Sequence, residues 1–169
     1  MPDPIVQCVC KEWCALAPDV ESLAQRAAQA CLVPGDATAP PPGGGGLTIV
    51  LADDALLHQL NRDHRGQDQS TNVLAFAAVP PPPYLGDVIL SHETLLREAR
   101  AQGKSPGDHL SHLVVHGVLH LLGYDHDTDK NANQMEACEI QILKNLGIAD
   151  PYTVCESALA TGASGERYG

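Results

Sequence analysis

The stretch HGVLHLLGYDH, residues 116–126, decides the predicted fold, because it places two histidines on an apolar helix and a third just beyond it. His116 and His120 are four residues apart, so on a helix their rings share one face, with about 5 to 6 Å between the Cβ atoms. Gly123 can adopt a positive φ and end the helix, so that the chain turns back and presents His126. The stretch therefore predicts one Zn2+ per chain, held by His116, His120 and His126.

Three imidazole ligands leave one position of a tetrahedral zinc ion open to water, which is typical of a catalytic rather than a structural site. The spacing also matches the metzincin protease pattern except at Gly117, where a metzincin carries its general-base glutamate. Glycine cannot accept a proton, so the usual route of peptide hydrolysis lacks its key group. His112 precedes His116 by one turn, but it would lie about 12 Å along the axis from His120 and is not expected to be a fourth ligand.

The length and composition suit one domain with a core built from aliphatic side chains. The chain has 169 residues, of which only 4% are aromatic. We predict a single metal-dependent hydrolase domain over residues 1–152, with Pro/Gly-rich loops at 39–46 and 80–83 and a disordered tail at 153–169. No segment is long enough to cross a bilayer and the first residues lack the features of a secretion signal, so a cytoplasmic location with reduced cysteines is expected.

The net charge of −11 excludes general electrostatic attraction to nucleic acid, because phosphate contacts need Lys and Arg. Any contact with RNA must therefore be local. Arg97, Arg100 and Lys104 are spaced three and four apart and would form one stripe on a helix, although an ordinary solvated helix face has the same pattern.

The distribution of apolar residues and capping residues predicts an alternation of strands and helices. Strands are expected at 5–10, 47–52, 72–77 and 85–89, and helices at 20–32, from Asp53 or Asp54 toward 61, at 92–103, at 106–122 and at 129–146. The segment from 110 to 122 is apolar on nearly every side and should be buried against the sheet.

Several further segments occur in the order found in one known family. They are Leu60-Asn61, Arg65-Gly66, Thr71-Asn72-Val73-Leu74 with Phe76, Leu85-Gly86-Asp87, Met135-Glu136 with Glu139, and Asp150-Pro151-Tyr152. Together with residues 116–126 they resemble the YbeY-type endoribonucleases, which are bacterial ribosomal RNA maturation factors. The resemblance spans roughly residues 47–152, with departures at Ala75, Ala77 and 130–134.

The resemblance implies an α+β fold, a small mixed β-sheet of about four strands flanked by about five helices with a zincin-like metal helix. It places the family's zinc ligands on His116, His120 and His126, and its functionally important arginine on Arg65. The implied function is a single-strand-specific endoribonuclease in rRNA processing and ribosome maturation, in which zinc-bound water and Arg65 act on the phosphodiester. The implied partners are single-stranded or ribosomal RNA and ribosomal subunit or assembly proteins, with neither membrane nor DNA.

Alternatives remain open at this point. Arg65 could instead form a surface ion pair with Asp63 or Asp68, and no general base can be identified. Asp87 and Asp125 are candidates for orienting a ligand histidine through its second nitrogen. The rival functions are a non-catalytic ribosome assembly factor with structural zinc, and a metallopeptidase-like hydrolase, which predicts that glutamate would be tolerated at Gly117.

Overall fold

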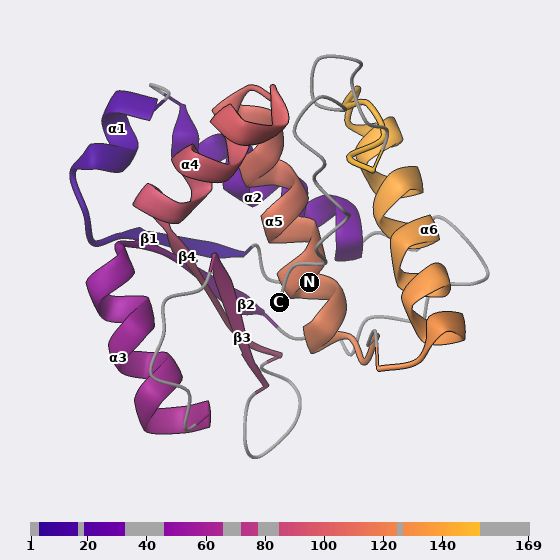
Figure 1. Cartoon of the computed structure of the whole chain (residues 1–169), viewed down its shortest axis with the longest axis horizontal. Helices are drawn as coiled ribbons and strands as arrows, with labels where there is room; N and C mark the ends of the chain where they lie inside the picture. Colours follow the sequence, from indigo (N-terminus) through magenta and orange to yellow (C-terminus); the bar gives the residue numbers. More distant parts are fainter. Residues whose placement is uncertain are drawn as a thin grey trace.

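The computed structural model describes residues 4–16, 19–32, 46–65, 72–77, 85–124 and 127–152, with the backbone alone at residues 64 and 65 (Figure 1). The predicted loop at 39–46, apart from Gly46, lies outside these ranges, as do the predicted loop at 80–83 and the predicted tail at 153–169. Asp125 and His126 also lie outside them.

The four predicted strands form a single mixed sheet, which confirms the predicted α+β class. The strands are β1 (Ile5–Cys8), β2 (Leu47–Ala52), β3 (Val73–Ala77) and β4 (Gly86–Ser91). Their order is β1-β2-β4-β3, with β1, β2 and β4 mutually parallel and β3 antiparallel to β4. The register pairs Leu47 with Gly86 and Val73 with Leu90, which brings the end of β4 beside the start of β3.

Six helices lie within the described ranges, one more than predicted. They are α1 (Glu12–Leu16), α2 (Val20–Leu32), α3 (Asp54–Arg65), α4 (His92–Gln102), α5 (Pro106–Leu121) and α6 (Asp129–Asn145). The unpredicted helix, α1, is only five residues long and is too short for a periodic pattern. Trp13 fixes it in place, because its buried indole Nε1 donates a hydrogen bond to the Ala52 carbonyl at 2.8 Å.

The caps confirm where α4 and α5 begin. Ser91 and Ser105 accept hydrogen bonds from the backbone N–H groups of Thr94 and Asp108, at 3.4 and 3.1 Å. The helix α4 ends at Gly103, which adopts φ 66°. These bonds satisfy backbone donors that a helix cannot satisfy itself.

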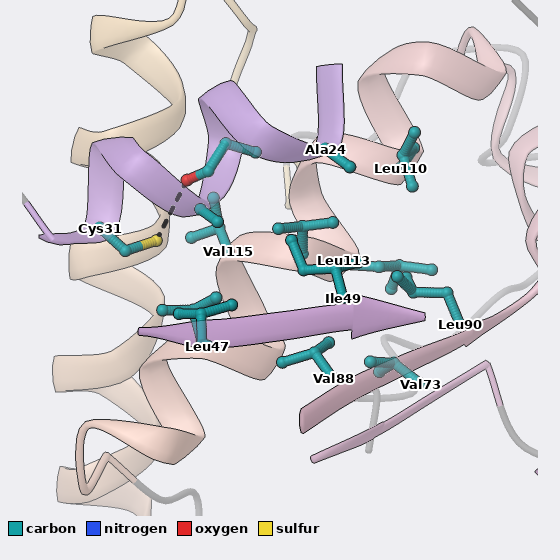
Figure 2. Packing of buried hydrophobic residues seen from close by; sticks show 14 of the residues in the cluster. Ala24, Cys31, Leu47, Ile49, Val73, Val88, Leu90, Leu110, Leu113 and Val115 are labelled. Atoms are coloured by element: carbon teal, nitrogen blue, oxygen red, sulfur yellow. Dashed lines mark hydrogen bonds between the residues drawn. The ribbon is translucent and has the colours of Figure 1, made fainter. Parts of the chain in front are cut away.

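Helix α5 is the central helix of the fold, in contact with β3, β4, α2, α4 and α6. Helix α3 contacts β3 and β4 through a separate apolar cluster made of Ala52, Leu57, Leu74 and Ile89. Figure 2 shows Leu47 and Ile49 of β2 beside Leu113 and Val115 of α5 in the larger core. Within the described part of the chain, no helix is both long and apolar enough to span a bilayer.

Gly117 lets α5 approach the sheet closely. A Cβ atom at this position would lie 2.6 Å from Val88 Cγ1 and 3.4 Å from Val73 Cγ2. Val88 is fully buried and β-branched, so it cannot move aside without displacing β4. The glycine therefore fixes the depth at which His116 and its neighbours sit in the fold.

Candidate metal centre

His116 and His120 point toward each other from successive turns of α5. Their Nε2 atoms are 3.2 Å apart, with ring centroids separated by 4.7 Å. His116 is buried and His120 is partly exposed near the end of the helix. The prediction that these two rings share one face is confirmed. The third predicted ligand, His126, lies outside the described residues.

The outer nitrogen of each ring contacts an acceptor. His116 Nδ1 lies 2.6 Å from Glu139 Oε1, and His120 Nδ1 lies 3.1 Å from the backbone oxygen of Tyr124. A carbonyl oxygen or an ionised carboxylate can only accept, so Nδ1 carries the hydrogen in both rings. In the neutral imidazole the Nε2 atom then holds a lone pair.

This tautomer assignment makes the pair a fitting site for a metal ion. Two lone pairs that face each other at 3.2 Å repel, and a metal ion between them would turn this repulsion into attraction. Two nitrogens at about 2.0–2.1 Å from a tetrahedral zinc ion would be roughly 3.3–3.4 Å apart, close to the separation observed. Among the residues that the structure describes, no group of three or more His, Cys, Asp or Glu side chains forms a site. A complete zinc site therefore needs at least one ligand from outside them.

Glu139 is the carboxylate that orients His116. Its side chain is fully buried on α6, and it accepts hydrogen bonds from His116 Nδ1 at Oε1 and from His112 Nε2 at Oε2, the second at 2.9 Å. Burial alone would raise the pKa of Glu139, but the hydrogen bonds from His112 and His116 outweigh it and lower that pKa to about 2. Burial also lowers the pKa of His112. The carboxylate is therefore ionised, and the lowered pKa of His112 favours the neutral form of that ring.

Sequence reasoning had considered Asp87 and Asp125 for this orienting role and had missed Glu139. A signal was present in the sequence, since α6 carries a stripe of apolar residues that includes Met135 and Ile142. Glu139 lies four residues after Met135 on that buried face, where a carboxylate needs a partner. His112, which was not expected to be a metal ligand, donates a hydrogen bond to the Glu139 carboxylate instead.

The structure describes the predicted basic stripe on α4 but not the side chain of Arg65. Arg65 ends α3, and its side chain lies outside the described structure, so its role stays a prediction. In the basic stripe, Arg97 lies 3.6 Å from Asp54, and Lys104 donates to the Pro151 carbonyl at 2.6 Å. Two of the three cations thus have partners within the protein, and Arg100 is exposed.

The cysteines that the structure describes are free thiols. Cys10 donates to the Glu12 carboxylate at 2.7 Å. Burial and that hydrogen bond raise the pKa of Cys10 to about 11, which favours the protonated thiol.

Comparisons with known proteins identify the family to which the chain belongs. A family model described as Endoribonuclease YbeY matches residues 15–147. A protein of that name from Paramagnetospirillum magneticum is 52% identical over 152 residues, which cover 85% of this chain and 91% of the relative. Its counterpart from Azorhizobium caulinodans is 50% identical over 148 residues, covering 84% of this chain and 91% of the relative. The solution structure of a Thermotoga maritima protein, at 20% identity, matches with a TM-score of 0.50 over 89% of this chain and 99% of that one, and supports the fold alone.

Proposed function

The chain belongs to the YbeY family of endoribonucleases, and from this premise we propose that it is a single-strand-specific, zinc-dependent endoribonuclease acting in ribosomal RNA processing. The observation that carries the proposal is the convergence of the His116 and His120 Nε2 atoms, both with lone pairs, at 3.2 Å. The proposed substrates are single-stranded segments of ribosomal RNA, met in the cytoplasm on ribosomal subunits or with assembly proteins.

We assign the metal ligands to His116, His120 and His126, with one zinc ion per chain. A zinc ion held there would supply Lewis-acid stabilisation of a phosphoryl oxygen and activation of water. The protein's own contribution is orientation: Glu139 and the Tyr124 carbonyl hold the Nδ1 hydrogens, so both Nε2 atoms stay available to a cation.

Glu139 supports this role and not that of a general base. Both its oxygens accept hydrogen bonds inside the protein, and its side chain has no exposed surface. A general base must come within hydrogen-bond reach of the proton that it abstracts. Glu139 therefore acts on the reaction through His116.

Arg65 is the proposed contact to the RNA phosphate. A guanidinium can donate two parallel hydrogen bonds to phosphate oxygens and stabilise charge that develops there, which lysine reproduces poorly. The proposal rests on the residue type and the family resemblance. Arg62, on the same helix, is exposed and lies 3.6 Å from Asp63, which makes it a matched control.

The packing of Gly117 argues against a metallopeptidase. A peptidase of the metzincin kind would need glutamate at this position. The Cβ of any such side chain would lie 2.6 Å from Val88 Cγ1, so glutamate could enter only if α5 or β4 moved. The tolerance that the peptidase alternative predicts is not expected of this fold.

The test compares purified natural protein with His116→Ala, Arg65→Ala and Arg62→Ala on a labelled single-stranded RNA and its duplex. We expect zinc in the natural protein, cleavage of the single strand only, and loss of cleavage in the His116 and Arg65 variants, with Arg62→Ala unchanged. If the His116 and Arg65 variants both cleave like the natural protein, the activity belongs to a contaminant. Bound zinc without any cleavage would favour a non-catalytic assembly factor.

A further inference from the structure

The residues that follow α6 return to the metal helix. The helix ends at Gly147, which adopts φ 80°, and the Ile148 N–H donates to the Leu143 carbonyl at 2.8 Å. This pattern of a left-handed glycine with a backward hydrogen bond is a common way to end a helix and reverse the chain. It brings residues 148–152 back toward α5.

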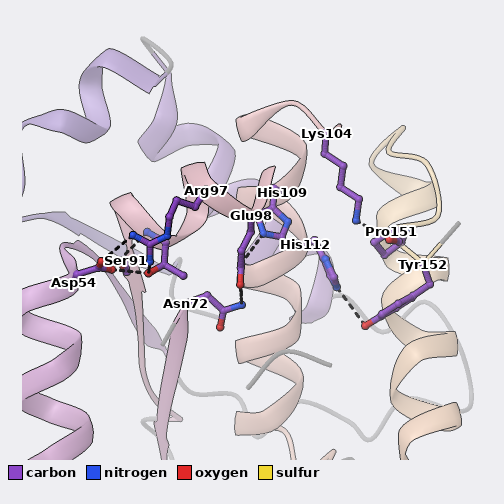
Figure 3. Close-up of polar contacts among 11 residues, drawn as sticks. Asp54, Asn72, Ser91, Arg97, Glu98, Lys104, His109, His112, Pro151 and Tyr152 are labelled. Atoms are coloured by element: carbon purple, nitrogen blue, oxygen red, sulfur yellow. Dashed lines mark hydrogen bonds and ion pairs between the residues drawn. The ribbon is translucent and has the colours of Figure 1, made fainter. Parts of the chain in front are cut away.

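Two interactions hold this returning segment in place. The ammonium group of Lys104, just after α4, donates to the Pro151 carbonyl at 2.6 Å (Figure 3). Asp150 Oδ1 accepts the Tyr152 backbone N–H at 2.8 Å, which shapes the turn that presents the tyrosine. Lys104 is partly buried, and the Asp150 and Glu98 carboxylates attract its ammonium group. This attraction helps to keep the ammonium group beside the returning segment.

The Tyr152 side chain ends at the carboxylate of Glu139. Its hydroxyl donates to Glu139 Oε2, and the same hydroxyl lies 3.4 Å from His112 Nε2. The ring stands edge-on to His112, with centroids 5.4 Å apart and an interplanar angle of 83°. Figure 3 shows Tyr152 reaching toward His112 from the segment beyond Pro151. One oxygen of Glu139 thus receives two donors, from His112 and Tyr152.

Two donors at one oxygen determine where the other oxygen points. The terminal torsion of a glutamate is broad and roughly two-fold, so a single hydrogen bond leaves the plane of the carboxylate poorly defined. With Oε2 held by His112 and Tyr152, Oε1 is directed at His116 Nδ1, 2.6 Å away. The hydrogen on that nitrogen is what leaves Nε2 available to a cation.

We propose that Tyr152 is a positioning residue for the metal centre: its hydroxyl fixes the Glu139 carboxylate, and Glu139 in turn fixes the ring orientation and tautomer of His116. This inference rests on the proposed function, because it takes His116 to be a metal ligand. It extends the site to a residue that lies beyond α6. Lys104 contributes indirectly, by holding the backbone that carries the tyrosine.

The test is Tyr152→Phe, which removes only the hydroxyl. The first measurement is Zn2+ affinity, by competition with a chromophoric chelator. The second is the tautomer of His116 in the metal-free protein, by two-bond 15N–1H correlation at alkaline pH. We expect the dissociation constant for Zn2+ to rise about tenfold, as for other outer-sphere partners of a ligand histidine, and a population with hydrogen on Nε2 to appear. Ser105→Ala is the matched control, because it removes a hydroxyl hydrogen bond at the start of α5, far from His116 on that helix.

Each outcome bears on the inference. Zn2+ affinity within about twofold of the natural protein, with the His116 tautomer unchanged, would overturn it, since an outer-sphere partner should matter more. Equal losses in Tyr152→Phe and Ser105→Ala would overturn it as well, because the effect would then be general destabilisation. If Tyr152→Phe does not fold, Lys104→Met decides, with a smaller loss of affinity in the same direction expected and no loss contradicting the proposal. The tautomer needs no metal and no RNA, so a natural protein that binds no zinc would refute the proposed function while this measurement still tests Tyr152.

Discussion

Two buried histidines of helix α5 each meet a glutamate from a neighbouring helix, and they differ in which ring nitrogen meets the carboxylate. Near the start, His109 Nε2 donates to Glu98 Oε1 of α4 at 3.0 Å. Near the end, His116 Nδ1 donates to Glu139 Oε1 of α6 at 2.6 Å. Both rings are almost completely buried. A buried histidine beside a carboxylate is therefore no sufficient sign of a metal site.

The difference lies in what remains on the far side of the ring. At His116 the Nε2 atom, at the tip of the ring, faces the Nε2 of His120. At His109 that same atom is occupied by Glu98, whose two oxygens also accept the side-chain amide of Asn72 at 3.0 and 3.2 Å (Figure 3). The cluster around His109 thus joins α4, α5 and the start of β3. The cluster around His116 instead leaves two ring nitrogens that can bind a cation. We propose that the His109 arrangement supports the fold and that the His116 arrangement binds the metal ion.

The largest expected difference between the two clusters follows from removing each histidine. We expect His116→Ala to weaken Zn2+ binding by more than the roughly 100-fold that outer-sphere changes reach, because a ligand itself is lost. His109→Ala should keep its zinc affinity and lose at least about 1–3 kcal/mol of stability, since Glu98 loses a partly buried hydrogen bond. Chelator competition and urea unfolding measure the two effects. Equal losses of zinc affinity would erase the distinction.

Replacing each carboxylate tests the same distinction one step further from the metal. Glu139→Gln should weaken Zn2+ binding by about 10- to 100-fold, because the amide cannot accept from both imidazoles as the carboxylate does. Glu98→Gln, in the other cluster, should leave zinc affinity unchanged. Chelator competition on the two variants at one pH measures both. A Glu98 variant that loses as much affinity as the Glu139 variant would contradict the assignment.

Two glycines on α5 provide a smaller test, one beside each cluster. Gly117→Ala should cost about 1–3 kcal/mol, because the new Cβ would lie 2.6 Å from Val88 Cγ1 and overpack the core. Gly107→Ala meets only Leu23 Cδ1, at an ordinary 3.5 Å, and should gain up to about 1 kcal/mol from helix propensity. Thermal unfolding of the metal-free variants measures both. The packing argument fails if Gly117→Ala is as stable as Gly107→Ala.

The acid sensitivity of the metal-free protein provides the last test. The pKa of His112 is lowered by burial, so below about pH 6.5 the unfolded chain binds a proton that the folded one resists, and stability falls by at most about 1.4 kcal/mol per pH unit for one proton. The pKa of Glu139 is lowered to about 2, so its contribution is present above the unfolded value of 4.5 and is lost as the pH falls toward 2. Urea unfolding at pH 7, 5.5 and 4 checks the sign. The slope between pH 7 and 5.5 should shrink in His112→Gln, and a stability that rises on acidification would refute the pKa assignments.

The parts of the fold that sequence could predict are those determined locally. The apolar run over residues 47–52 and the capping serines Ser91 and Ser105 are local signals, and the structure confirms the elements that they predict. Helix α1 was not predicted because its stability depends on Trp13 contacting Ala52, 39 residues away. Contacts between residues far apart in the sequence were equally unpredictable at the candidate site.

Spacing within α5 was enough to predict that His116 and His120 converge. It could not identify Glu139, which is 23 residues from His116 and meets it only through the packing of α6 on α5. The contact of the Tyr152 hydroxyl could not be predicted for the same reason, since its orientation depends on the turn at Gly147 and on Lys104. A glutamate on an otherwise apolar stripe was the available clue, and the partner of such a group has to be found in three dimensions.

The tie between Tyr152 and Glu139 has a consequence for the timing of biosynthesis. Ribosomes make a chain vectorially, and His116 is joined to it 36 residues before Tyr152. At about 5–20 residues per second, those residues take roughly 2–7 s to add, and throughout that interval the nascent protein contains His116 but not Tyr152. Enzyme still on its parent ribosome would therefore bind zinc weakly, and full affinity would arrive only as translation of this region ends.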